Sequence, residues 1–336
     1  MTQEEYKRLN DYLNDVFLGF QKKNKIFVDN LIPILGLSTI INDYFKNNIK
    51  SFQIKSKSNH LTFEDVYLLA REIIEKISPR YLGEYDELIK SGALNFNFNS
   101  KGYSEFSFNR YNEIVNKKLI NISREFNYDD VVSLIREFFH YTQVKMNKKI
   151  SYNFDFFTEF IAIYFETIAK RYLIEEKNIS KDELIINNRV ESLYRNNIKL
   201  YQYITVLVAY EYLGNINENT EEDLRNILRI RDPSFQKECL QTLNKLDSLK
   251  KNKPVVNLFN QNYRYVVGII LAYYALEHSE LEDMVELNDK INTEYAELSA
   301  QEVLNKVGIP LNQNMVLESL DIIKKSISDL VLGKTK

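Results

Sequence analysis

The chain has 336 residues, with 44 Lys and Arg against 47 Asp and Glu, so its net charge is −3. This balance excludes the basic surface typical of nucleic-acid binding, and the single cysteine, Cys239, excludes an intramolecular disulfide. The 9 Gly and 5 Pro are too few for a turn-rich β protein and favour long helices. The N-terminus is polar, and the longest apolar run, residues 265–276, is too short to span a membrane. We therefore expect a cytoplasmic protein with neither a nucleic-acid nor a membrane partner.

Apolar residues recur at helical spacing within residues 1–60, which predicts an N-terminal helical segment before a main domain over residues 61–332. The first helix of that domain is expected over residues 61–77. Thr62 and Asp65 have the spacing of a capping box, and the helix should end before Ser78-Pro79.

Strand-like alternation is confined to one window, about residues 93–123. Residues 95–99 read Asn-Phe-Asn-Phe-Asn, and residues 105–109 alternate in the same way around Phe106 and Phe108. This pattern predicts a β-hairpin, and residues 118–122 are expected to add a third strand. The result would be a small antiparallel sheet with Phe96 and Phe98 on its packed face.

The next helix contains the most informative stretch, residues 131–140, which read VVSLIREFFH. Compared with the zinc-protease pattern H-E-x-x-H, it matches at Glu137 and His140 and differs at Arg136. Residues four apart share a helix face, so positions 136 and 140 can reach one site. A guanidinium has no lone pair to donate and carries a fixed positive charge, so Arg136 cannot ligate Zn²⁺ and would repel it.

A second, mainly apolar helix is predicted over residues 155–173. Glu159 and Glu166 lie two helical turns apart on one face of it. A carboxylate on a buried helix needs a cation, a metal or hydrogen-bond donors. Further helices are expected near residues 188–213, 220–230, 234–249, 259–276, 280–290 and 315–332.

The order of these features resembles the M3 family of metallopeptidases, of the oligoendopeptidase F type, over roughly residues 61–330. Besides the two helices, the resemblance rests on a turn at residues 101–104 (KGYS), a tyrosine segment at residues 263–268 (YRYVVG) and a tail at residues 308–311 (GIPL). It implies a mainly α, zincin-like bundle of helices around a cleft, and it covers only the catalytic half of such enzymes.

The resemblance also assigns roles by position. His140 and Glu159 would be zinc ligands, Glu137 the general base, and Tyr263 or Tyr265 the oxyanion donor. An extended peptide would join the sheet edge, and the residues expected to bind it are Phe96, Phe98 and Tyr103. The chain departs from the family pattern at Arg136, in a ligand position, and at Phe139, where a small residue is usual.

Because of Arg136, we expect a catalytically impaired pseudopeptidase that binds a peptide or protein partner and has no cofactor. Arg136 is expected to contact Glu159 and to neutralise Glu159 and Glu137. Two alternatives stay open. One is an active zinc oligopeptidase with unusual ligands, such as His140, Glu159 and a recruited Glu166, and the other is a structural or scaffold protein. The oligomeric state is not predicted.

Overall fold

The structure is a computed structural model in which the chain forms two compact units. One comprises Met1–Asn47 and Ser192–Val266, and the other comprises Asn48–Glu191 and Val267–Lys336. The structure describes residues 61–97, 108–112, 117–123, 127–145, 155–179, 255–296, 298, 300–310 and 312–332, and the isolated residues 2–4, 7, 10, 11, 196, 217, 219 and 222. The division into residues 1–60 and 61–332 remains a prediction, and the helices expected within residues 1–60, 188–213, 220–230 and 234–249 lie outside the described ranges.

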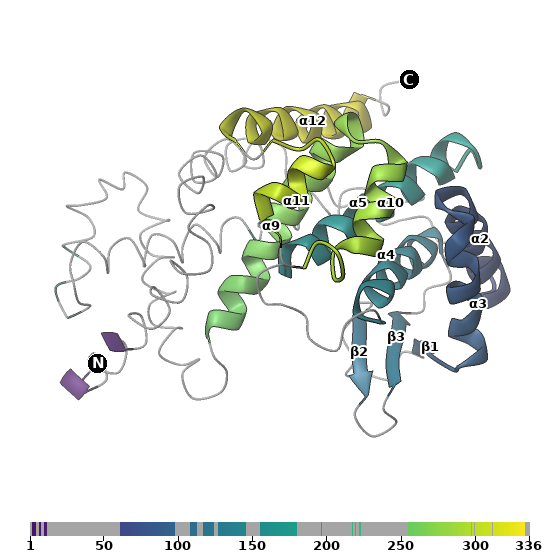
Figure 1. Ribbon diagram of the computed structural model, residues 1–336, viewed down its shortest axis with the longest axis horizontal. Helices are drawn as coiled ribbons and strands as arrows, with labels where there is room; N and C mark the ends of the chain where they lie inside the picture. Colours follow the sequence, from purple (N-terminus) through teal and green to yellow (C-terminus); the bar gives the residue numbers. More distant parts are fainter. Residues whose placement is uncertain are drawn as a thin grey trace. The chain divides into compact units, whose positions relative to one another are not determined.

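The described part of the chain is mainly helical, as predicted (Figure 1). Its elements, in order, are α2 (Phe63–Ile77), the 3-10 turn η2 (Pro79–Tyr81), α3 (Leu82–Lys90), β1 (Leu94–Asn97), β2 (Phe108–Asn112), β3 (Lys117–Ser123), α4 (Tyr128–Lys145), α5 (Asp155–Glu175), α9 (Val255–His278), α10 (Leu281–Lys290), α11 (Ala300–Lys306) and α12 (Gln313–Leu332). Among the described residues, no helix is long and apolar enough to cross a membrane.

Helix α2 begins at the predicted capping box. The Asp65 backbone N–H donates to Thr62 Oγ1 over 3.1 Å, and the Thr62 backbone N–H donates to Asp65 Oδ2 over 2.7 Å. These bonds satisfy N–H groups that the first helical turn leaves without partners. The helix ends at Ser78, in extended conformation before Pro79, so its start and stop signals are confirmed.

The sheet corrects the predicted antiparallel hairpin. Its strand order is β1-β3-β2; β1 runs parallel to β3, with Leu94 opposite Ile120, and β2 runs antiparallel to β3, with Phe108 opposite Asn121. The sheet is therefore mixed, and β1 and β2 are separated by β3 instead of pairing with each other. Alternation identifies a strand but does not name its neighbour, and the apolar segment of β3 takes the central place.

Helix α4 is the centre of its unit and packs against α2, α5, α10 and β3. Phe138 and Phe139 on α4 are both fully buried. The Phe139 ring stacks on Phe165 of α5 with centroids 3.8 Å apart, and the Phe138 ring meets Tyr85 of α3 edge-on at 5.4 Å. The large residue at 139 thus fills the interior between α4 and α5, which explains why no small residue is needed there.

A network of neutral hydrogen bonds joins α4 to α10 and η2; we call it the Asn288 network. Asn288 Nδ2 donates to Tyr81 Oη over 2.9 Å and to Thr142 Oγ1 over 3.2 Å. Asn288 Oδ1 accepts from Gln143 Nε2 over 3.2 Å. The side chains of Asn288, Thr142 and Gln143 are all buried. Tyr81 in turn donates to Asp289 Oδ1 over 2.6 Å, so hydrogen bonds connect polar side chains of three elements.

Candidate functional site

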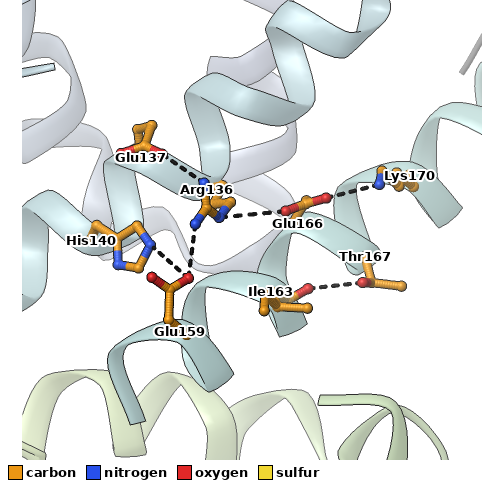
Figure 2. Close-up of polar contacts among 8 residues, drawn as sticks. All are labelled: Arg136, Glu137, His140, Glu159, Ile163, Glu166, Thr167 and Lys170. Carbon is orange, nitrogen blue, oxygen red and sulfur yellow. Dashed lines mark hydrogen bonds and ion pairs between the residues drawn. The ribbon is translucent and has the colours of Figure 1, made fainter. Parts of the chain in front are cut away.

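Arg136 lies where α4 meets α5, with its guanidinium directed at carboxylates from both helices (Figure 2). Its Nη2 is 2.8 Å from Glu159 Oε2 on α5, and its Nη1 is 2.9 Å from Glu137 Oε1 on α4. Its Nε is 3.7 Å from Glu166 Oε2, also on α5. The predicted contact between Arg136 and Glu159 is confirmed, and the guanidinium bridges the two helices.

Two further side chains extend this group, which we call the Arg136 cluster. Lys170 Nζ lies 2.8 Å from Glu166 Oε1, and His140 Nε2 lies 3.6 Å from Glu159 Oε2. Each of these two glutamates is therefore placed between Arg136 and a second nitrogen group (Figure 2). The cluster forms a continuous path from Lys170 on one side to His140 on the other.

Helical periodicity explains why these side chains meet. On α4, positions 136 and 140 are one turn apart and share a face; on α5, Glu159 and Glu166 are two turns apart and Lys170 follows one turn later. The predicted shared face of the two carboxylates is confirmed, since both contact Arg136. Most of the other residues between positions 157 and 173 of α5 are apolar and buried, so these charges lie in apolar surroundings.

The cluster is nearly closed to solvent. The side chains of Glu137, Glu159 and Glu166 are at most 4% exposed, and that of Arg136 is 12% exposed. Carboxylates removed from water carry a large desolvation cost unless they are paired with a charge and hydrogen-bonded. Arg136 supplies both, because its planar guanidinium directs several N–H groups and a permanent charge at separate carboxylates.

The donor set does not fit the zinc ion that the family resemblance implies. Zn²⁺ in a catalytic site takes three protein donors, but Arg136 has no lone pair. Moreover, its guanidinium and His140 Nε2 both approach the same atom, Glu159 Oε2, so this carboxylate oxygen is already occupied by two nitrogen groups. Across the described ranges, no three His, Cys, Asp and Glu side chains are grouped so that they could hold a metal ion.

The remaining predicted site residues lie on other elements or outside the described residues. Tyr263 and Tyr265 lie on α9, in the portion assigned to the other compact unit. The Tyr265 ring has the Arg264 guanidinium 5.5 Å from its centroid. Phe96 lies on β1, while Phe98 and Tyr103 fall outside the described residues. The oxyanion role of the tyrosines and the binding role of Phe96, Phe98 and Tyr103 remain predictions.

Lys170 is the member of the cluster that the sequence analysis missed. A signal for it exists, because Lys170 follows Glu166 by four residues on a mainly apolar helix, the spacing at which opposite charges pair. Its side chain is only 10% exposed, so the pair belongs to the interior. The Asn288 network was missed as well, and its residues form no recognisable motif.

Comparison with known proteins identifies a fold. No protein-family model matches the sequence, and a search of curated protein sequences finds no match. The structure is similar to that of a Chlamydophila abortus protein assigned as a peptidase, with a TM-score of 0.54 and 16% identity over 98% of this chain. It is also similar to a protein from Bacillus anthracis strain Ames assigned as an oligoendopeptidase F, with a TM-score of 0.51 and 13% identity over 95% of this chain.

The chain spans 55% and 56% of the lengths of these two proteins. At such low identity the likeness concerns the fold and not the activity. The chain therefore has the mainly helical fold of structures assigned as peptidases.

Proposed function

We propose that this chain is a pseudopeptidase: an M3-like peptidase fold whose zinc site has become an ion-pair cluster and whose former cleft binds a peptide or protein partner. The observation that carries the proposal is the position of Arg136, 2.8 Å from Glu159 and 2.9 Å from Glu137. By the family resemblance, Glu159 is a former ligand and Glu137 the former base. A base that is paired with a guanidinium, beside a ligand set lacking one donor, cannot activate a water as the zinc mechanism requires.

The retained fold supports partner binding. An extended peptide can bind by adding a strand to the open edge of a sheet, with main-chain hydrogen bonds providing affinity. Among the described strands, β1 and β2 each pair only with β3, so each has one edge without a described neighbour. The β1 edge is the better candidate, because β1 carries Phe96 and leads directly to Phe98 and Tyr103.

The catalytic part of the proposal is tested by measuring zinc content and peptide cleavage on protein purified without added metal or chelator. We expect less than stoichiometric zinc and no cleavage of a mixed peptide library by the wild-type chain. Arg136→His, which completes the H-E-x-x-H pattern, should bind zinc more tightly than the wild type. Stoichiometric zinc in the wild type together with chelator-sensitive cleavage would instead establish the alternative, an active zinc oligopeptidase.

The binding part needs a defined ligand and a matched control. A peptide selected on the wild-type protein from a displayed random library is labelled and titrated by fluorescence anisotropy. Phe96→Ala on β1 should weaken its binding, whereas Phe63→Ala on α2, where the side chain is 42% exposed, should not. Equal affinity for both variants would place the peptide away from β1. Failure to select any peptide would favour the structural or scaffold alternative.

A further inference from the structure

Helix α9 also lies next to the Arg136 cluster, because it approaches α5 closely at Glu159. Gly268 is a buried residue of α9. A Cβ atom added there would lie 3.0 Å from Glu159 Cβ, 3.0 Å from the Phe160 backbone N and 3.2 Å from the Glu159 carbonyl carbon. Both Gly268 and Glu159 belong to the same compact unit. The backbones of the two helices are therefore in contact where the cluster is attached.

A second contact shows that α9 continues along α5. Arg171 of α5 donates from Nη2 to Glu277 Oε1 over 2.7 Å and from Nη1 to the Leu276 carbonyl oxygen over 3.5 Å. The two contacts follow the same order along both helices, Gly268 with Glu159 and then Leu276 with Arg171. Contacts between α5 and α9 are therefore not limited to Gly268.

We propose that Gly268 is a positioning residue for the Arg136 cluster. Because it has no side chain, the backbone of α9 can pack directly against Glu159 and fix the position of its side chain. The Glu159 Cβ contact is the critical one, because the carboxylate that meets Arg136 and His140 extends from this atom. Any atom added at Gly268 pushes against the base of that side chain and against backbone that cannot rotate away. This inference depends only on the described geometry and does not require the proposed peptide binding.

Two alanine substitutions separate this role from the general effect of replacing a helical glycine. Gly83 on α3 is also helical, but a Cβ added there would meet nothing within 4 Å. Gly83→Ala should keep or raise the Tm, since alanine favours helix more than glycine does. Gly268→Ala should lower the Tm by about 3–8 °C, partly because α5 and α9 must move apart in a packed interior and partly because the Glu159 carboxylate is displaced from Arg136.

A spectroscopic readout tests the effect on the cluster itself. The chain has only 3 histidines, so the imidazole proton signals can be assigned by single substitutions. Gly268→Ala should shift the His140 signal, because His140 Nε2 lies 3.6 Å from Glu159 Oε2. Gly83→Ala should leave that signal unchanged. If Gly268→Ala does not fold in plain buffer, the spectra are recorded with trimethylamine N-oxide, which stabilises folded states.

The decisive step repeats Gly268→Ala in a Glu159→Gln background, where the ion pair with Arg136 has been removed. If Gly268 acts through the Glu159 carboxylate, the loss of Tm should be clearly smaller in this background than in the wild type. An equal loss of Tm in both backgrounds, or a His140 signal that does not respond to Gly268→Ala, would show that Gly268 serves helix packing alone and would overturn the proposal.

Discussion

Helix α4 has two buried polar interfaces of opposite character. Toward α5 it presents Arg136, which makes charged contacts with Glu159 and Glu166 of α5 and with Glu137 of α4 itself. Toward α10 it presents Thr142 and Gln143, which make neutral hydrogen bonds with Asn288. The second interface demonstrates that neutral groups are sufficient to connect buried helices in this fold. Charged side chains are therefore not required for the packing of α4. Their presence at the interface with α5 is what the proposed loss of a metal would leave behind.

The two interfaces should differ first in how much a single truncation lowers the free energy of unfolding. Arg136→Ala leaves three carboxylates without their common partner in the interior, so it should lower the free energy of unfolding by about 3–5 kcal/mol. Arg171→Ala removes a similar ion pair with Glu277 that is exposed on both sides, and it should cost only about 0–1 kcal/mol. Urea denaturation measures both. Equal costs would mean that burial does not distinguish the Arg136 cluster from a surface pair.

A truncation in the neutral interface should lower the free energy of unfolding by a smaller amount. Asn288→Ala removes a hydrogen-bond partner from Tyr81, Thr142 and Gln143 together, and we expect it to cost about 2–3 kcal/mol. Asn305→Ala, at an exposed position of α11, should change stability by no more than about 0.5 kcal/mol. Denaturation at low and high salt adds a second criterion, because the cost of losing neutral hydrogen bonds should hardly depend on ionic strength. If Asn288→Ala lowered the free energy of unfolding more than Arg136→Ala does, the neutral interface would be the more sensitive of the two.

The smallest expected difference concerns the pH dependence of the free energy of unfolding. Burial and the hydrogen bond to Asp289 raise the pKa of Tyr81 above the ordinary tyrosine value of about 10. A raised pKa in the folded state stabilises it fully below pH 10, and this stability is lost as the pH rises toward the folded pKa. At pH 11 the loss should be on the order of 1 kcal/mol for this one group.

Tyr81→Phe should remove that part of the alkaline destabilisation. Its free energy of unfolding should therefore fall less between pH 10 and 11 than that of the wild type, even though the variant is less stable at neutral pH. Parallel pH curves for the two proteins would show that Tyr81 does not contribute to the pH dependence.

The two interfaces also differ in how far the sequence predicts them. A charged residue in an apolar helix is conspicuous, and helical spacing then indicates which charges meet, so the contact between Arg136 and Glu159 was predictable. Asn288, Thr142 and Gln143 could equally lie on a surface, and only the tertiary packing buries them. The sheet shows the same limit, because the alternation around Phe96 and Phe108 located strands but could not show that β3 separates β1 from β2.

Arg136 and Glu159 should be energetically coupled across α4 and α5, and a double-mutant cycle with Arg136→Met and Glu159→Gln measures this coupling. The cycle compares the cost of both substitutions together with the sum of the separate costs, each measured by urea denaturation. We expect the double variant to be more stable than that sum implies, by about 1–3 kcal/mol, because each single variant leaves a buried group without its partner. Additive costs would contradict it, since Arg136 would then not be the group that holds Glu159 in place.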